Sequence, residues 1–384
     1  MDNVCHTLVG GVLARAGCDR LSPLATPTML VAANLPDVDI VSAMWGDLAY
    51  LEHHRGITHS LVGIAVEAPL LAGVAVGLAR IARWRNPSTP APRFLALTLV
   101  ALIGLASHLL LDWTNSYGVR PLLPFDSSWF YGDIAFVIDP WMWLVLAAAL
   151  FLGARRERVA MALWGVLFAA MAIAVVAQQL ARQTESGGLA ATIVWIGLLA
   201  AVVAARIAAR SLPQRALAAG AVCAVVGYWV ALGVLHATAT RTVAASAPGG
   251  AADAAVQVAT IPTFMRPDRW ITLRATGSVI TASTVQLGAS PRVASDTIPR
   301  HLDDASVEAA LATCPGEVAA GFNRFMYAEV RDSTASGERT VLLRDARFGG
   351  VPGRYGFATT PVVIDAGLRY VPDGRPCPRS VVRW

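Results

Sequence analysis

The sequence predicts a mainly α-helical protein, organised as a polytopic α-helical membrane bundle with a small β-rich C-terminal extramembrane domain. Three observations support this fold class. The 384 residues are 55% hydrophobic and only 15% charged, whereas about a quarter of the residues of a soluble domain are charged. Apolar runs long enough to cross a bilayer recur along the first two thirds of the chain. Alternating, strand-like sequence follows in the last third.

The apolar runs predict about six membrane spans, because roughly 20 apolar residues suffice to cross the hydrocarbon layer. They lie at residues 60–82, 94–113, 134–152, 159–180, 189–207 and 216–235. Two earlier apolar stretches, 7–17 and 24–45, are short, and prolines and aspartates interrupt the second. We expect these two to form short re-entrant or interfacial helices that pack against the bundle.

Arginine is concentrated in the loops that follow the first, third and fifth predicted spans. The positive-inside rule places these loops in the cytoplasm. The first 58 residues, the 114–133 loop and the C-terminal tail are then outside. Five polar residues that are far apart in sequence therefore fall near one membrane face: His59, His108, Asp112, Asp133 and Asp139. They were singled out by residue type, and not by their position in this topology.

Composition divides the chain into three parts. Residues 1–236 form the predicted membrane-embedded domain, the Ala/Thr/Gly-rich residues 237–260 a linker, and residues 261–384 a β-rich domain. In the last part, residues 325–331, a turn at 333–337 and residues 339–344 predict a hairpin. Cys314 and Cys377 both lie there and would form a disulfide if that side is an oxidising periplasm. The alternative is two free thiols.

His108 and Asp112 are four residues apart on a predicted helix, so their side chains lie on one face and can reach one ion. The spacing alone is weakly specific. Its position near the end of an apolar span strengthens it, because a carboxylate beside hydrocarbon is costly without a partner. The alternative is a polar pair at the interface in contact with water.

The segment His54-Arg-Gly-Ile-Thr-His59-Ser60 predicts an ion and anion site at the start of a span. Gly56 allows an unusual turn, and Thr58 is a suitable N-cap for a span that begins at His59. Arg55 supplies a fork-shaped donor for a phosphate or carboxylate. The alternative is a basic interfacial loop. The residues alone do not decide whether His53 or His54 is the ligand.

Further acidic residues and one histidine complete the candidate set. Asp37 and Asp39 follow a proline, so one can bind metal while the other binds a second metal or orients a histidine. The alternative is a turn with solvated acids. By itself His6 would be interpreted as a core histidine. It is a candidate ligand only because the other candidate ligands lie in the same part of the chain. Asp133 and Asp139 flank an apolar segment; either can act as a base, and Asp139-Pro140 can equally cap a helix.

Nucleic-acid binding is excluded as a function class. The formal net charge is +5, but the arginines are scattered over short loops with no basic stripe and no interleaved aromatic residues.

Taken together and in order, these motifs resemble those of the YdjM-like membrane-bound metal-dependent hydrolases of bacteria, over roughly the first 145 residues. The motifs are His6-Thr7, Leu35-Pro-Asp37-Val-Asp39, His54-Arg-Gly-Ile-Thr-His59-Ser60, His108-x-x-x-Asp112 and Asp133…Asp139-Pro140. Their order is also similar to that of zinc-dependent phospholipase C and the related single-strand nucleases. The chain lacks the N-terminal Trp ligand and the later His-x-x-x-Glu pair of those enzymes, so we expect one or two ions.

The resemblance implies metal ligation by His6, Asp37 or Asp39, His54 or His59, His108 and Asp112, with His54 favoured over His53. The ion is expected to be Zn²⁺, with Mn²⁺ or Fe²⁺ as alternatives. Arg55 and Ser60 would bind substrate, and Asp39, Asp133 or Asp139 would orient or deprotonate a water.

These inferences predict a hydrolase at the outer face of the bacterial inner membrane, with a periplasmic C-terminal domain. Membrane lipids are the expected partners, and a phospholipid or another lipid-linked phosphoester is the expected substrate. One alternative is a non-catalytic envelope scaffold with a structural metal. The other is a transporter, in which the mid-span Glu67 would be the functional acid.

Overall fold

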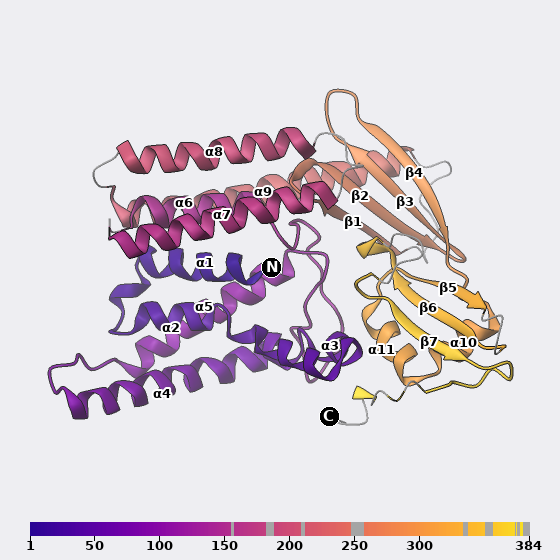
Figure 1. The fold of residues 1–384 in the computed structure, drawn as a ribbon, viewed down its shortest axis with the longest axis horizontal. Coiled ribbons are helices and arrows are strands. Elements are labelled where there is room, and N and C mark those ends of the chain that lie inside the picture. Colours follow the sequence, from indigo (N-terminus) through magenta and orange to yellow (C-terminus); the bar gives the residue numbers. More distant parts are fainter. Residues whose placement is uncertain are drawn as a thin grey trace. The chain divides into compact units, whose positions relative to one another are not determined.

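The computed structural model describes residues 1–154, 157–181, 188–208, 212–246, 257–332, 337–349, 356–372, 374 and 377–378. These residues form two compact units (Figure 1). The membrane unit comprises Met1–Pro36, Thr58–Leu235 and Pro262–Pro267. The second unit comprises Asp37–Ile57, His236–Ile261 and Asp268–Trp384. Residues 37–57, which the sequence places early in the chain, therefore group with the C-terminal part.

The membrane unit begins with short helices, as predicted. Helix α1 (Asn3–Ala16) begins after Asp2, whose carboxylate accepts from the backbone N–H of Cys5. This satisfies one of the donors that a helix N-terminus leaves without an intrahelical partner. A 3₁₀ turn (Cys18–Arg20) leads to α2 (Ala25–Ala32). At 14 and 8 residues, both α-helices are shorter than a span requires.

Five helices in the described part of the chain are long and apolar enough to cross a membrane. They are α4 (Leu61–Arg85), α5 (Phe94–Trp113), α7 (Arg158–Ala181), α8 (Gly188–Ala208) and α9 (Gln214–Ser246). The fold class is confirmed. The predicted cytoplasmic connections after the third and fifth spans include residues 155–156 and 209–211, which lie outside the described residues.

The predicted span 134–152 is the exception. Helix α6 (Pro140–Leu152) has only 13 residues, about 20 Å at 1.5 Å per residue. Most of its side chains are buried, and it packs against α1 and α8. The indole of Trp195 on α8 donates to the carbonyl of Pro140 at its first turn. Because protein surrounds α6, its backbone ends need not reach the membrane surfaces.

Small residues let α2 approach α5 closely. A Cβ on Gly104 of α5 would lie 2.7 Å from the Cβ of Ala32 and 3.2 Å from the carbonyl oxygen of Met29. Glycine at this position therefore sets the distance between the two helices. The approach brings the backbone that follows α2 against the part of α5 that carries His108, which is central to the site described below.

The second unit contains two antiparallel sheets. The first has the order β1-β2-β3-β4 and the second β5-β6-β7. The strands are β1 (Gln257–Thr263), β2 (Arg266–Thr276), β3 (Val279–Gln286), β4 (Arg292–Pro299), β5 (Met326–Asp332), β6 (Arg339–Asp345) and β7 (Thr360–Ile364). The predicted hairpin is present, with Ala328 paired to Leu343, while most of its predicted turn (333–336) lies outside the described residues. Helix α9 continues to Ser246, into the predicted linker.

Residues 37–57 add helices to the second unit. The 3₁₀ segment η2 (Leu35–Trp45) and α3 (Asp47–His53) precede the 3₁₀ turn η3 (Ile57–His59), which returns to the membrane unit. Helix α3 packs against α11 (Cys314–Phe322), which follows α10 (Ala305–Leu311). Of the two alternatives for Cys314 and Cys377, the structure has the disulfide, which joins residues 63 positions apart in the chain.

The disulfide predicts a stability loss on its removal. Replacing Cys314 and Cys377 by Ser should lower the free energy of unfolding by about 2–5 kcal/mol, because the unfolded chain gains the freedom of a long open loop. Thermal unfolding of the detergent-purified protein measures this. The Cys18→Ser/Cys223→Ser variant is the control, since both thiols are free. Two alkylatable thiols at 314 and 377 in the untreated protein would contradict the prediction.

The close approach of α2 and α5 predicts that Gly104→Leu destabilises the membrane unit by about 1–3 kcal/mol through overpacking. Gly73→Leu on α4 is a matched control, because nothing lies within 4 Å of a Cβ built there. Thermal unfolding of both variants in detergent measures the difference. Equal melting temperatures for the two variants would show that the helices separate at no cost.

Candidate metal centre

Three predicted residues converge at the C-terminal end of α5. The Nε2 atoms of His59 and His108 are 3.1 Å apart, and they lie 3.3 and 3.4 Å from Oδ2 of Asp112. All three side chains are fully buried. His108 and Asp112 share one face of α5, as their spacing predicts, and His59 comes from the turn before α4. The structure thus has a His/Asp cluster that can hold a metal ion.

The backbone after α2 orients His108. Its Nδ1 lies 2.8 Å from the carbonyl oxygen of Ala33, and since a carbonyl only accepts, Nδ1 carries the proton. Nε2 of His108 then carries a lone pair and faces Nε2 of His59. Two imidazole nitrogens at this distance need a proton or a cation between them. A backbone carbonyl that fixes the tautomer of a ligating histidine is the usual partner in metal sites.

His6 of α1 is part of the same buried cluster. Its ring stacks on that of His108 with centroids 3.7 Å apart, and its Nε2 is 3.5 Å from Oδ1 of Asp112. Within the described residues, neither ring nitrogen has a hydrogen-bond partner. Burial lowers the pKa of His6 to about 3, so the ring is neutral at physiological pH, which is the form that binds metal ions.

The chemistry of this donor set fits a divalent ion. Ligand atoms 2.0–2.1 Å from a tetrahedral Zn²⁺ lie about 3.3–3.4 Å from one another. The three separations among His59, His108 and Asp112, 3.1–3.4 Å, match this spacing. Imidazole and carboxylate ligands also suit Mn²⁺ and Fe²⁺. Ligation through Nε2, the His6 nitrogen near Asp112, would offset the cost of burying that atom.

The turn before α4 differs from the prediction. Thr58 is not the N-cap, because it lies within η3, two residues before the cap position. Ser60 takes this role: its Oγ accepts from the backbone N–H of Gly63 at 2.9 Å, and it is fully buried. The predicted substrate-binding residue Ser60 thus holds the first turn of α4. The N–H of Leu61 donates to the carbonyl of Pro121 and ties this turn to the 114–133 loop.

A second group of predicted residues lies together in the second unit. One ligand atom from each of Asp37, Asp39 and His54 lies within 4.8 Å of the others. Oδ1 of Asp39 is 2.7 Å from Nδ1 of His54, and Oδ2 accepts from the backbone N–H of Arg55 at 2.8 Å. The Asp39 carboxylate thus orients the imidazole and leaves its Nε2 edge to other partners. His54, not His53, occupies this position.

The turn that carries Arg55 is left-handed at Arg55 itself, with φ 55°, and not at Gly56 as expected. A non-glycine residue in this region carries a backbone cost. The hydrogen bond from the Arg55 N–H to Asp39 holds it there. The Arg55 side chain is buried, so this segment is not the solvated basic loop that the sequence left as an alternative.

The two remaining predicted acids have different surroundings. Asp133 is buried with φ 55°, and the residues beside it are anchored to the end of α5 by bonds from Gly132 N to Trp113 O and from Ile134 N to Thr114 O. Asp139 caps α6: Oδ1 accepts from the N–H groups of Trp141 and Met142, and Oδ2 from the Tyr228 hydroxyl. Of the two roles that the sequence allowed for Asp139, a base or a helix cap, the structure shows the helix cap.

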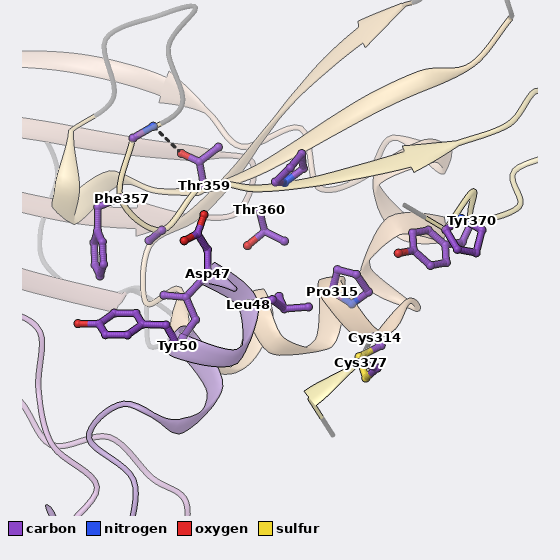
Figure 2. Close-up of a pocket in the computed structure, with 15 residues that line it drawn as sticks. Asp47, Leu48, Tyr50, Cys314, Pro315, Phe357, Thr359, Thr360, Tyr370 and Cys377 are labelled. Carbon is purple, nitrogen blue, oxygen red and sulfur yellow. Dashed lines mark hydrogen bonds between the residues drawn. A yellow bond between two sulfur atoms is a disulfide. The ribbon is translucent and has the colours of Figure 1, made fainter. Parts of the chain in front are cut away.

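A pocket of about 690 Å³ adjoins the second group. Figure 2 shows Asp47, Leu48 and Tyr50 on α3 at one wall of the pocket. The ring of Tyr50 also stacks on His54, with centroids 4.6 Å apart. Phe357, Thr360 and the Cys314–Cys377 disulfide line other parts, and the described residues of the lining include no histidine or arginine. Its walls are therefore mainly apolar.

Sequence reasoning missed several residues that hold the site. Asp2 caps α1 and accepts from the indole N–H of Trp143 on α6. The Met1 ammonium contacts Oδ1 of Asp112. The Ala33 carbonyl and the Tyr50 ring had no sequence signal at all. Asp2 did: an aspartate directly before an apolar helix is typical of an N-cap.

Comparison with known proteins supports the resemblance. Residues 1–181 match the model of a family described as YdjM inner membrane protein. A protein of Bacillus subtilis (strain 168), described as uncharacterized protein YfhP, is 25% identical over 160 residues, which is 39% of this chain and 45% of that relative. The chain thus spans less than half of the relative's length. No solved structure matches. The predicted similarity to zinc-dependent phospholipase C stays a prediction.

The matched segment contains every residue that the sequence singled out as a ligand or catalytic group. Over its first 181 residues the chain is therefore similar to the YdjM inner membrane proteins, as its motifs predicted.

Proposed function

We propose that this protein is a membrane-bound metal-dependent hydrolase that acts on a phosphoester, such as a phospholipid or a lipid-linked substrate, at the outer face of the bacterial inner membrane. The observation that carries the proposal is the buried triangle of His59 Nε2, His108 Nε2 and Asp112 Oδ2, with sides of 3.1–3.4 Å. The two facing Nε2 atoms need a proton or a cation between them, and a divalent ion bound to all three ligand atoms would meet this need.

The proposed ligands of a first ion are His59, His108 and Asp112, with His6 beside them. Asp37 and His54 would hold a second ion, and Asp39 would orient His54. Zn²⁺ is the ion we expect, with Mn²⁺ or Fe²⁺ as alternatives. A bound ion of this kind polarises a phosphoryl oxygen and lowers the pKa of a bound water.

The other polar residues have positioning roles. The Arg55 guanidinium binds the negative charge of the phosphoester as a fork-shaped donor. Asp133, anchored to the residues that directly follow Asp112, is the acid we propose as the base for the attacking water. Asp39 and Asp139 are already engaged, the first with His54 and Arg55, the second with α6 and Tyr228.

Two further observations support the proposed side of the membrane. The Cys314–Cys377 disulfide is typical of an oxidising compartment, such as the bacterial periplasm. The arginine-rich connections belong on the opposite, cytoplasmic side. The pocket beside Tyr50 has the volume and apolar walls of a small-molecule site, so we propose that it takes an uncharged part of the substrate.

The metal ligands predict the metal content of the purified protein. Elemental analysis of the detergent-purified wild type should give about one or two equivalents of a divalent ion. The His108→Ala/Asp112→Ala variant should lose at least one of them. His53→Ala is the matched control, since it neighbours His54 but is outside both groups. A wild type that binds no Zn²⁺ or Mn²⁺ even after reconstitution would refute the metal centre.

Hydrolysis separates an enzyme from a scaffold. The metal-loaded protein should release product from a lipid phosphoester in mixed micelles, and a chelator should abolish the reaction. Bound metal without turnover on any phosphoester of a broad panel would contradict the hydrolase and leave a structural ion.

Arg55→Gln should raise KM for an anionic substrate more than it lowers kcat, because the guanidinium binds the ground-state charge.

The Asp39–His54 pair predicts that Asp39→Asn weakens metal affinity or activity by about 10- to 100-fold, as loss of an orienting carboxylate does in other metal sites. Asp303→Asn, before α10, is the control, because its carboxylate is exposed and lies outside both groups and the pocket lining. Metal titration of the two variants measures the effect. Equal affinities would assign Asp39 a purely structural role in the turn.

A further inference from the structure

The 3₁₀ segment η2 presents an apolar stripe. With 3.0 residues per turn, positions three apart eclipse one another along a 3₁₀ helix. Val38, Val41 and Met44 fall on one such line, and their side chains are 56%, 47% and 81% exposed. Ile40 and Trp45 beside them are also exposed. We call these five residues the apolar stripe.

The polar residues of the same segment point the other way. Asp39 accepts from His54 Nδ1 and the Arg55 N–H, and Ser42 is 5% exposed. The segment therefore has its charge inside and its hydrocarbon outside. A segment whose outer side faces water has the opposite arrangement. An exposed apolar patch beside a polar site marks a surface that contacts something other than water.

The chain keeps this segment near the membrane. Segment η2 begins with Leu35 and Pro36, which belong to the membrane unit, and the stripe starts two residues later at Val38. Two steps along the chain reach at most about 7 Å. At the end of the stretch 37–57, only three residues separate Ile57 from Leu61, the first residue of α4. Helix α4 has 25 residues, about 37 Å at 1.5 Å per residue, so its first turn reaches the edge of a hydrocarbon core about 30 Å thick.

We propose that the apolar stripe inserts into the interfacial layer of the lipid bilayer and anchors the Asp37/Asp39/His54 group at the level of the lipid headgroups. The occupant of this face is the bilayer of the membrane that the protein itself spans. The segment carries no lysine or arginine, so its binding is driven by burial of hydrocarbon, with Trp45 at the depth that tryptophan prefers.

This anchoring identifies the substrate class, a conclusion that rests on the proposed hydrolase function. A site held beneath an inserted stripe receives its substrate from the bilayer. The substrate is then an amphiphile with at least one acyl or polyisoprenoid chain in the membrane and its phosphoester at the headgroup level. A fully water-soluble phosphoester would gain nothing from the stripe.

Spin labelling tests the insertion without reference to catalysis. A nitroxide is attached to Met44→Cys in a background where Cys5, Cys18 and Cys223 are Ser, and the protein is reconstituted in vesicles of phosphatidylethanolamine and phosphatidylglycerol. Collisions with oxygen should exceed those with a water-soluble nickel chelate. Thr297→Cys on the exposed strand β4 is the control and should show the reverse. Nickel-dominated relaxation at position 44 would overturn the proposal.

Charged substitutions in the apolar stripe test whether the substrate reaches the site from the bilayer. Val41→Asp/Met44→Asp should lower kcat/KM for a vesicle-borne lipid phosphoester roughly tenfold or more, because two large apolar side chains lose their burial. Turnover of a short-chain, water-soluble phosphoester should be unchanged. Equal losses on both substrates would overturn the access route and leave the stripe as a support of the site. Absence of turnover in the wild type would refute the hydrolase while leaving the spin-label result intact.

Discussion

The buried carboxylate of Asp112 is the constraint on which the rest of the membrane unit depends. It lies in the last turn of α5 and is fully buried, and an ionised carboxylate in such a place needs compensating groups. The structure supplies imidazoles from three separate elements. His108 comes from α5 itself, His59 from the turn before α4 and His6 from α1. The C-terminal end of α5 must therefore lie beside the N-terminal ends of α1 and α4.

Helix packing serves this convergence. Gly104 allows α2 to lie directly on α5, and this closeness brings the carbonyl of Ala33 to Nδ1 of His108. The same contact that buries apolar surface between the helices thus also fixes the tautomer of a proposed ligand. Helix α6, too short to span alone, is held by Asp2 through Trp143 and by Trp195 at its first turn. Stability and site geometry are consequences of the same few contacts.

In the second unit, too, one carboxylate organises the polar groups around it. Asp39 holds both His54 and the left-handed Arg55, and Tyr50 covers the imidazole from α3. Because α3 packs against α11, next to the disulfide, the β-rich part of the chain supports this group. The C-terminal domain therefore has a structural relation to motifs that lie some 300 residues earlier in the sequence.

The sequence by itself determined the fold class, the short helices at the N-terminus and the face shared by His108 and Asp112, because hydrophobic length and helical period are local properties. It also predicted the hairpin of residues 325–344, and it left the Cys314–Cys377 disulfide and two free thiols as alternatives. Only the tertiary structure decided that Ser60 caps α4, that α6 is shorter than a span, and that His54 partners Asp39. These outcomes depend on groups distant in the chain, such as the Ala33 carbonyl and the Tyr50 ring, and no local pattern encodes where a backbone carbonyl or a stacking ring will lie.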